Sequence, residues 1–319
     1  MPEILTITLN PSLDLSATTP RVEAGPKLRL DAPVAEPGGG GINVARAALA
    51  MGGQVRAVAA LGGTTGARVA QLLREGGVPL SVFRLEGETR QSLSVTDAAG
   101  AQYRFVMPGP TWSDAEVAEF LKRLGDDVRR LGPGAIVVLS GSQPPGIGAD
   151  FPQRLVRALT GARVIVDTSG APLIHLIEAP APDARPHVLR MDQDESQAVA
   201  GHPLPDMSSS LALASRLVAR GVADAVVLGR GGDGSVLATA EMRLACTPPE
   251  VPVRSKVGAG DSFTAGLALV LARGGPWDEA LRLGTAAAAA AVMTPGTELC
   301  RGADVEALLP RCRIVAADA

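Results

Sequence analysis

Short apolar runs alternate with longer helical patterns along almost the whole chain, and this alternation constrains the fold more than any other feature. Each apolar run is short and rich in β-branched residues, as expected for a buried strand. Strands that alternate with helices predict an α/β fold: a doubly wound, mainly parallel sheet with helices on both faces. The expected strands are residues 4–9, 54–61, 80–85, 135–139, 164–167, 187–190 and 224–228, and the expected helices are residues 66–75, 113–131, 208–220, 261–273 and 277–293, with a further helix opening at 191–195.

Two regions with period-two alternation interrupt this pattern. Residues 89–96 and 102–107 flank a turn at 97–100, which predicts a β-hairpin. Short alternating segments also occur before residue 35. We expect these parts to leave the main sheet and to form a small β-sheet lid, inserted at about residues 11–35 and 88–108. The lid and the main sheet together would make one domain that spans residues 1–319.

The charge balance and the cysteines exclude several classes of protein. The chain has 319 residues with 30 basic and 33 acidic side chains, a formal net charge of −3, so we expect no nucleic-acid partner and no membrane partner. The longest run of small apolar residues, 286–293, is too short to span a bilayer, and no signal peptide is recognised. We expect a cytoplasmic protein in which Cys246, Cys300 and Cys312 are buried, reduced thiols.

A glycine-rich turn opens the expected helix at 261–273. Gly258, Ala259 and Gly260 precede Asp261, so backbone N–H groups and a carboxylate meet at the start of a helix. The helix dipole favours an anion at this position, and a carboxylate beside it is suited to take a proton from a hydroxyl during phosphoryl transfer. The alternative interpretation is a simple helix cap with Asp261 as the N-cap residue.

A second glycine run covers residues 38–41 and leads into another helical pattern. Four consecutive glycines are costly in backbone entropy, and they are typical of a backbone that approaches a ligand closely. Asn43 follows in the first turn and is suited to bind a sugar hydroxyl. The alternative is a flexible linker, which would not be expected to continue directly into a regular helix.

Several polar residues stand where ligands bind in α/β proteins. Asp14 follows the first expected strand, and Ser140 follows the strand at 135–139, which places both at the ligand-binding edge of an open sheet. Lys27 and Arg90 would be cations on the lid, suited to a phosphate. For Asp14, Lys27 and Arg90 the alternative is a solvated surface charge. The alanine-rich stretch at 286–291 is suited to a flat ligand or, equally, to tight helix packing.

Three separated motifs together resemble the PfkB, or ribokinase-like, family of sugar kinases. They are Thr8-Leu9-Asn10-Pro11-Ser12-Leu13-Asp14, the segment from Gly38 to Arg46, and Val257-Gly258-Ala259-Gly260-Asp261-Ser262. Within the family the chain is most similar to the branch that phosphorylates fructose 6-phosphate, since many tagatose-6-phosphate and fructose-1-phosphate kinases carry a lysine in place of Gly40. The resemblance implies a kinase that transfers a phosphoryl group from Mg·ATP to the 1-hydroxyl of fructose 6-phosphate. Tagatose 6-phosphate and fructose 1-phosphate stay open as alternative substrates, as does a sugar-phosphate-binding protein without kinase activity.

The resemblance also implies roles for individual residues. Asp261 would be the catalytic base, and Gly258, Ala259 and Gly260 would form an anion hole for the γ-phosphoryl group. The sugar phosphate would be held by Asp14, Lys27, Gly39, Gly40, Asn43, Arg90 and Ser140. The lid would exclude water and, as often in this family, pair with its copy on a second subunit to make a homodimer.

The nucleotide side departs from the family pattern. The resemblance implies that ATP is bound by Arg190, Asp192, Gly229, Gly231, Gly234 and Lys256, and that Glu195 acts on Mg²⁺. Many relatives, however, read Lys-Pro-Asn-x-x-Glu where this chain has Arg190-Met191-Asp192-Gln193-Asp194-Glu195. Relatives often read Ser-Leu-Gly where Gly229-Arg230-Gly231 aligns. Our hypothesis is that Arg230 or Lys256 compensates the added negative charge of Asp192.

Overall fold

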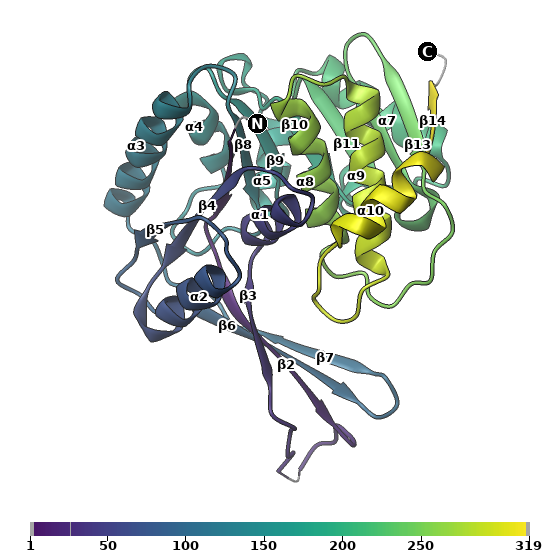
Figure 1. Cartoon of the computed structure of the whole chain (residues 1–319). Helices are drawn as coiled ribbons and strands as arrows, with labels where there is room; N and C mark the ends of the chain where they lie inside the picture. The colour runs from purple at the N-terminus through teal and green to yellow at the C-terminus, as the bar shows by residue number, and fades with distance from the viewer. Residues whose placement is uncertain (1–2, 26, 317–319) are drawn as a thin grey trace.

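The computed structural model describes residues 3–25 and 27–316, and a ten-stranded sheet forms its centre (Figure 1). In spatial order the strands are β14 (Arg313–Ala316), β13 (Arg243–Thr247), β12 (Ser235–Ala238), β11 (Ala225–Gly229), β10 (Val188–Met191), β9 (Arg163–Asp167), β8 (Ile136–Ser140), β1 (Ile4–Thr8), β4 (Val55–Leu61) and β5 (Leu80–Arg84). All neighbours from β11 to β5 are parallel, and β12 to β14 add an antiparallel edge. Residues 1–2, 26 and 317–319 of the expected domain lie outside the described residues.

Helices cover both faces of the sheet, as the alternating pattern predicts. One face carries α1 (Gly40–Ala50), α2 (Gly63–Glu75), α8 (Ala259–Ala272), α9 (Trp277–Val292) and α10 (Gly302–Leu308). The other face carries α3 (Asp114–Leu131), α4 (Phe151–Ala158), α5 (Ala171–Glu178), α6 (Gln193–Ala200) and α7 (Met207–Ala219). Successive strand residues point to opposite faces, so Ile4 joins the first core and Leu5 the second. The α/β class with a doubly wound, mainly parallel sheet is therefore confirmed.

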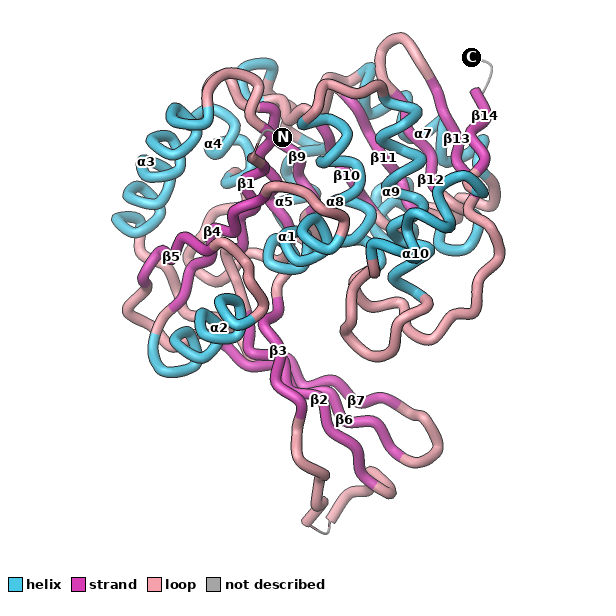
Figure 2. The backbone as a smooth tube through the Cα atoms, viewed as in Figure 1, coloured by secondary structure: helices cyan, strands magenta, loops and turns pink. Residues whose placement is uncertain are grey.

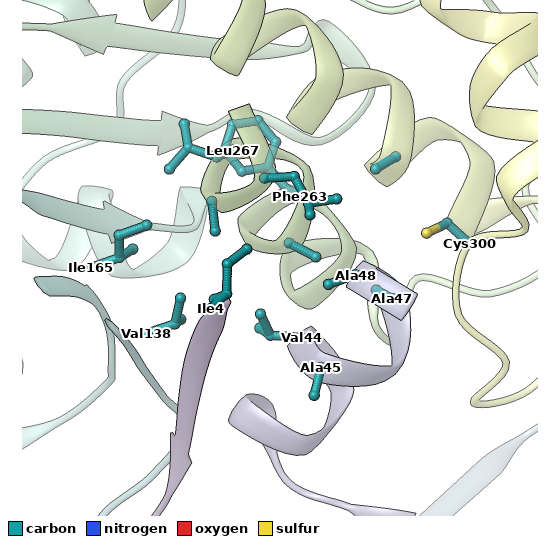
Figure 3. Close-up of a cluster of buried hydrophobic side chains, with 14 of the residues drawn as sticks. Ile4, Val44, Ala45, Ala47, Ala48, Val138, Ile165, Phe263, Leu267 and Cys300 are labelled. Carbon is teal, nitrogen blue, oxygen red and sulfur yellow. The ribbon is translucent and has the colours of Figure 1, made fainter. Parts of the chain in front are cut away.

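The core beneath α1 and α8 fixes the two helices that begin at the glycine motifs. Figure 3 shows Val44 of α1 and Leu267 of α8 gathered around Ile4, all fully buried side chains. Burial of an aliphatic side chain of this size stabilises the folded state by roughly 1.5–3 kcal/mol. Because both helices are held on the same part of the sheet, their N-termini reach the same edge of it.

The alanine-rich stretch serves helix packing. Ala286, Ala287 and Ala290 of α9 are fully buried in the core that also contains α8. At the crossing of the two helices, a Cβ added at Gly284 would lie 3.0 Å from Phe263 of α8, and one at Gly266 would lie 2.8 Å from a carbonyl oxygen of α9. Small residues on both helices therefore allow close backbone approach, which is the packing interpretation of this stretch.

A second, four-stranded sheet projects from the body of the molecule and forms the lid (Figure 2). Its strands, in spatial order, are β3 (Val34–Gly38), β2 (Ser12–Thr19), β6 (Arg90–Asp97) and β7 (Gln102–Val106). The predicted hairpin is confirmed as β6 and β7, which pair antiparallel. The first lid segment extends three residues beyond the predicted boundary at 35, to Gly38. Asp14 consequently lies within a lid strand rather than in a loop after β1.

Two further expectations concerned the state of the cysteines and the presence of a membrane-spanning helix. All three cysteines are buried and free of disulfides, as predicted. Among residues 3–25 and 27–316, no helix combines the length and the apolar character that crossing a bilayer requires.

Candidate active site

The start of α8 has the form of an anion-binding turn. Gly258 precedes the helix with a left-handed φ of 75°, and no side chain in the described part of the chain caps the first turn. The N–H groups of this turn therefore lack a side-chain acceptor and are suited to an anion. Asp261 is the third residue of the helix, so the interpretation of Asp261 as the N-cap is wrong. A Cβ at Gly258 would lie 2.5 Å from Cδ2 of the buried Leu299, whose side chain would have to move to admit it.

Asp261 is held by a residue from the other glycine motif. The side-chain amide of Asn43, in the first turn of α1, donates a hydrogen bond of 3.0 Å to Oδ2 of Asp261. Burial, followed by the nearby charge of Asp167, raises the pKa of Asp261 to about 6, whereas Asn43, Arg190 and Ser140 act in the opposite direction. A carboxylate with this pKa is deprotonated at neutral pH and is close to the range in which a general base is effective.

Asp261 faces a pocket of about 240 Å³ at the carboxyl ends of the parallel strands. The pocket is lined by Ser140, Gly141, Ser142, Asp167, Thr168, Ser169, Arg190, Glu195, Gly260 and Asp261. The structure thus brings together Ser140, Arg190 and Glu195 with the turn at the start of α8, although they lie on three different segments of the chain. An open α/β sheet binds its ligands at this edge.

Five residues of the pocket lining were not among the predicted site residues: Gly141, Ser142, Asp167, Thr168 and Ser169. Asp167 is the charged one among them. It ends β9, and its Oδ1 lies 3.2 Å from Nη1 of Arg190, while its Oδ2 accepts a hydrogen bond of 2.9 Å from the hydroxyl of Thr264. The sequence did indicate Asp167, because open α/β sheets bind ligands at the carboxyl ends of their strands. This argument was applied to Ser140 and applies equally to the acid that ends the predicted strand 164–167. No sequence pattern indicated Thr264 as a residue of the site.

The segments 190–195 and 229–231, which we expected to bind the nucleotide, contact one another. The guanidinium of Arg190 lies over Gly260, where an added Cβ would be 2.8 Å from Nη1. A Cβ at Gly229 would lie 3.5 Å from Nη2 of the same arginine, and one at Gly231 would lie 3.9 Å from Oε1 of Gln193. The turn after β11 therefore packs against the turn after β10. The two segments in which we expected departures from the family pattern are thus neighbours in space.

Asp192 and Glu195 form a capping box at the start of α6. The N–H of Glu195 donates to Oδ1 of Asp192 at 2.8 Å, and the N–H of Asp192 donates to Oε2 of Glu195 at 2.9 Å. Burial raises the pKa of Glu195 to about 7, and the charges of Asp192 and Asp167 add to this effect. Asp192 thus serves as the N-cap of α6, a position that aspartate and asparagine fill equally well.

The Arg230 part of our charge-compensation hypothesis is wrong. Arg230 is only 4% exposed, and its guanidinium donates to the carbonyl oxygens of Leu204 and Pro205 and to the hydroxyl of Ser210. It therefore ties the turn after β11 to the loop between α6 and α7 and does not pair with Asp192. Lys256 is exposed just before the turn of residues 258–260, and its role stays a prediction.

The glycine run at 38–41 is packed tightly and is not a flexible linker. Gly39 has a φ of 119°, and a Cβ there would lie 2.6 Å from Thr8. A side chain at Gly40 would collide with Ser140, and one at Gly41 would collide with the backbone of Ile7. The run therefore seats the start of α1 directly against the ends of β1 and β8.

Asp14 and Arg90 lie near each other where the lid meets the body. The hydroxyl of Ser12 donates to Oδ1 of Asp14 at 2.6 Å, and Nε of Arg90 donates to the carbonyl oxygen of Asn10 at 3.2 Å. Burial lowers the pKa of Arg90, and the charge of Asp14 opposes this effect. Lys27 is exposed and lies in the loop between β2 and β3. Figure 2 shows this loop at the end of the lid that is far from the main sheet.

Comparison with known proteins agrees with this arrangement. The family model for pfkB family carbohydrate kinases matches residues 6–303. The chain is 38% identical to ATP-dependent 6-phosphofructokinase isozyme 2 of Escherichia coli (strain K12), across 96% of this chain and 97% of that protein. It is 30% identical to 1-phosphofructokinase of Bacillus subtilis (strain 168), across 98% and 99%.

Solved structures give the same result. The structure of phosphofructokinase-2 from Escherichia coli in complex with potassium matches with a TM-score of 0.88 and 37% identity, over 98% of this chain and 99% of that chain. Its complex with fructose-6-phosphate matches with a TM-score of 0.87 and 36% identity, over 98% and 99%. The chain described here belongs to the pfkB family of carbohydrate kinases, which transfer a phosphoryl group to a sugar hydroxyl.

Proposed function

We propose that this kinase transfers the γ-phosphoryl group of Mg·ATP to the 1-hydroxyl of fructose 6-phosphate and so makes fructose 1,6-bisphosphate. The observation that carries the proposal is the position of Asp261, a carboxylate with a raised pKa beside an uncapped helix N-terminus and within a pocket. The choice of sugar phosphate is supported by identities of 38% and 39% to relatives named ATP-dependent 6-phosphofructokinase isozyme 2.

The transfer step follows from the arrangement of the catalytic turn. Asp261 takes the proton of the 1-hydroxyl as that oxygen attacks the γ-phosphorus, and the bond from this phosphorus to the bridging oxygen of ADP breaks. The N–H groups of Gly258, Ala259 and Gly260 stabilise the negative charge on the transferring group. Asn43 keeps the carboxylate of Asp261 oriented through its hydrogen bond.

The sugar phosphate would be bound between the lid and the edge of the main sheet. Asp14, Gly39, Gly40, Asn43 and Ser140 are proposed to meet the sugar. Arg90 is proposed to bind the 6-phosphate, since a guanidinium pairs with phosphate in a bidentate manner. Among the described residues its side chain has one hydrogen-bond partner, a carbonyl oxygen, so most of its donors are available to a ligand.

The nucleotide would lie over the turns that follow β10 and β11. Arg190, Asp192, Gly229, Gly231, Gly234 and Lys256 are the residues proposed to contact ATP. Asp167, Glu195 and Asp261 bring three carboxylates to the pocket against the single guanidinium of Arg190. An anionic triphosphate is therefore expected to enter this pocket only with a cation.

The residues present fit a magnesium ion that arrives with the nucleotide. Among residues 3–25 and 27–316, no group of three or more acidic, histidine or cysteine side chains is arranged to hold a metal ion. Mg²⁺ is commonly bound by one or two carboxylates together with substrate phosphates, and Glu195 is the carboxylate proposed for this role. When bound, the ion would neutralise charge on the phosphate oxygens.

The substrate could also be fructose 1-phosphate or tagatose 6-phosphate. The first of these is supported by relatives named 1-phosphofructokinase, at 35% and 30% identity. The more similar relatives favour fructose 6-phosphate. Asp261 with its intact turn argues against a binding protein that lacks phosphoryl transfer, since binding alone does not require a base.

We further propose that the enzyme is a cytoplasmic homodimer that associates through the lid. Leu15, Leu93 and Phe105 are cross-strand neighbours on one face of the lid, and Phe105 is 55% exposed. An apolar sheet face of this kind is suited to a second copy. Lys27 is exposed in the loop between β2 and β3, and its contact with the sugar phosphate stays a prediction.

The experiment that tests the main proposal measures ADP release from Mg·ATP with fructose 6-phosphate, tagatose 6-phosphate and fructose 1-phosphate in parallel. Asp261→Asn serves as the blank. The proposal expects the highest kcat/KM with fructose 6-phosphate. A higher kcat/KM with either of the other sugars would overturn the substrate assignment, and full activity of Asp261→Asn would overturn the role of the base.

A further inference from the structure

A chain of three side chains leads from the interior of α8 to the pocket. Thr264 is fully buried, and its hydroxyl lies 2.9 Å from Oδ2 of Asp167 and 3.0 Å from the carbonyl oxygen of Gly260. The other oxygen of Asp167 lies 3.2 Å from Nη1 of Arg190. Both carboxylate oxygens of Asp167 are therefore engaged, one by the helix and one by the guanidinium.

Arg190 is confined by these contacts at the anion-binding turn. The position of a Cβ on Gly260 is 2.8 Å from Nη1, 2.9 Å from Nη2 and 3.0 Å from Cζ of Arg190, so the guanidinium lies flat over this glycine. A free arginine side chain has many rotamers, and the ion pair to Asp167 reduces them to one that faces the turn. Only glycine at position 260 leaves space for this arrangement.

The guanidinium of Arg190 keeps most of its donors for a ligand. Within the described part of the chain, its side chain makes one hydrogen bond, to Asp167, out of the five that a guanidinium can donate. The carboxylates of Asp167, Glu195 and Asp192 all favour its charged form. Arg190 is thus a charged group with unused donors that lines the same pocket as Asp261.

We propose that Asp167 and Thr264 are positioning residues, which hold Arg190 over Gly260 so that its guanidinium meets the phosphate chain of the nucleotide. This inference rests on the proposed function, because it takes the phosphoryl group to lie at the turn of residues 258–260. Asp167 acts through Arg190 and not on the nucleotide itself. Thr264 acts through Asp167 by fixing the orientation of the carboxylate.

The test is a double-mutant cycle on the affinity for Mg·ATP, measured by calorimetry in the absence of sugar. The variants are Asp167→Asn, Arg190→Met and the double variant, together with Thr264→Val and the conservative Thr264→Ser. Asp183→Asn is the matched control, because it removes a carboxylate from an exposed ion pair with Arg157 away from the pocket lining. Thermal unfolding of each variant monitors folding.

The proposal predicts that Asp167→Asn weakens Mg·ATP binding about tenfold in the wild-type background and leaves it unweakened in the Arg190→Met background. Thr264→Val is expected to weaken binding in the same direction by a smaller factor, and Thr264→Ser to restore it. Asp183→Asn should leave the affinity unchanged. The double-mutant cycle measures only the affinity for Mg·ATP, so its result can be interpreted even for a protein that transfers no phosphoryl group.

Two results would overturn the proposal. Equal weakening by Asp167→Asn in both backgrounds would mean that Asp167 acts on the nucleotide or its cation independently of Arg190. Unchanged affinity in the wild-type background would mean that Arg190 needs no positioning. Absence of turnover with every sugar phosphate, with the cycle as predicted, would instead contradict the proposed function alone.

Discussion

The side-chain amide of Asn43 donates a hydrogen bond of 3.0 Å to the carboxylate of Asp261, across 218 residues of sequence. This contact joins the first turn of α1 to the first turn of α8. Each of these turns follows a glycine motif, and the two helices share one core around Ile4. The glycine motifs therefore assemble a single site, in which one motif orients the acid that the other provides.

The hydrogen bond from Asn43 should set the pH range of catalysis. An N–H donor favours the ionised carboxylate and so lowers the pKa of Asp261, against burial and Asp167, which raise it to about 6. We expect kcat/KM of the wild-type enzyme to rise with pH through about 6, and the rise for Asn43→Ala to lie at higher pH. The measurement is the pH dependence of kcat/KM for both proteins.

A matched control for this change exists on α2. There the amide of Gln71 donates to the carboxylate of Glu75 at 2.7 Å on the exposed surface. Gln71→Ala removes the same kind of donor away from the pocket, and the pH profile should stay that of the wild type. An unshifted profile for Asn43→Ala would show that the contact to Asp261 does not tune the base.

Asp261 should reduce the stability of the fold at the pH where it works. Its pKa in the folded state, about 6, lies above the ordinary value of 3.8, so folding favours the protonated carboxyl. The associated stability is present below about pH 4 and is lost as the pH rises through about 6. Asp261→Asn keeps the shape without the charge, and we expect its Tm to exceed that of the wild type at pH 8 by a margin that shrinks towards pH 5.

The same variant, Asp261→Asn, should lose roughly 100- to 10,000-fold in kcat, the usual contribution of a general base.

Glu116→Gln is the control for the stability measurement, because its Tm difference from the wild type should have the opposite sign. The backbone N–H of Ser113, followed by other hydrogen bonds that outweigh burial, lowers the pKa of Glu116 in its capping box. Its variant should be less stable than the wild type at neutral pH and approach it on acidification. A Tm difference for Asp261→Asn that does not vary with pH would contradict the predicted linkage.

The sequence predicts the parallel core well because each strand there is a short apolar run between helices. The antiparallel edge was not predicted: β12 and β13 follow β11 through tight turns, and the run around Cys246 is too short to be distinguished from a loop. Helices α4 and α5 were also missed. They are eight residues each and carry a proline in the first turn, so their periodicity is weak.

The candidate site was predicted where local chemistry is distinctive. Glycine runs and the acid of Asp261 mark their positions by composition alone, whereas no local pattern reveals the contact between Asp167 and Thr264, which are 97 residues apart. The buried Arg230 shows the opposite case. Its place in the sequence suggested that it compensates the charge of Asp192, but only the fold shows that its two terminal nitrogens donate to Leu204, Pro205 and Ser210.

Arg90 should contribute to the affinity for the sugar phosphate more than to the rate of transfer. It is half-buried near Asp14 and donates to one carbonyl oxygen, so a phosphate would gain a desolvated cation as its partner. We expect Arg90→Met to raise KM for fructose 6-phosphate roughly tenfold or more, with a smaller change in kcat. Steady-state kinetics at saturating Mg·ATP measures both constants.

Arg104 provides the control for Arg90 within the same lid. It lies on β7, is exposed, and has no ion-pair partner among the described residues. Arg104→Met should leave KM for the sugar phosphate unchanged. Equal effects of the two substitutions would mean that KM responds to the overall charge of the lid and not to a contact with Arg90.

Phe105 and Val106 allow the proposed association through the lid to be tested on adjacent residues. They are similarly exposed, at 55% and 58%, but successive residues of β7 point to opposite faces of the lid sheet. Phe105 continues the apolar row of Leu15 and Leu93, whereas Val106 is paired with Ser92. Phe105→Asp should therefore turn a dimer into a monomer in sedimentation velocity, while Val106→Asp should leave the dimer intact. A wild-type chain that sediments as a monomer, or equal dissociation by both variants, would show that this face does not mediate association.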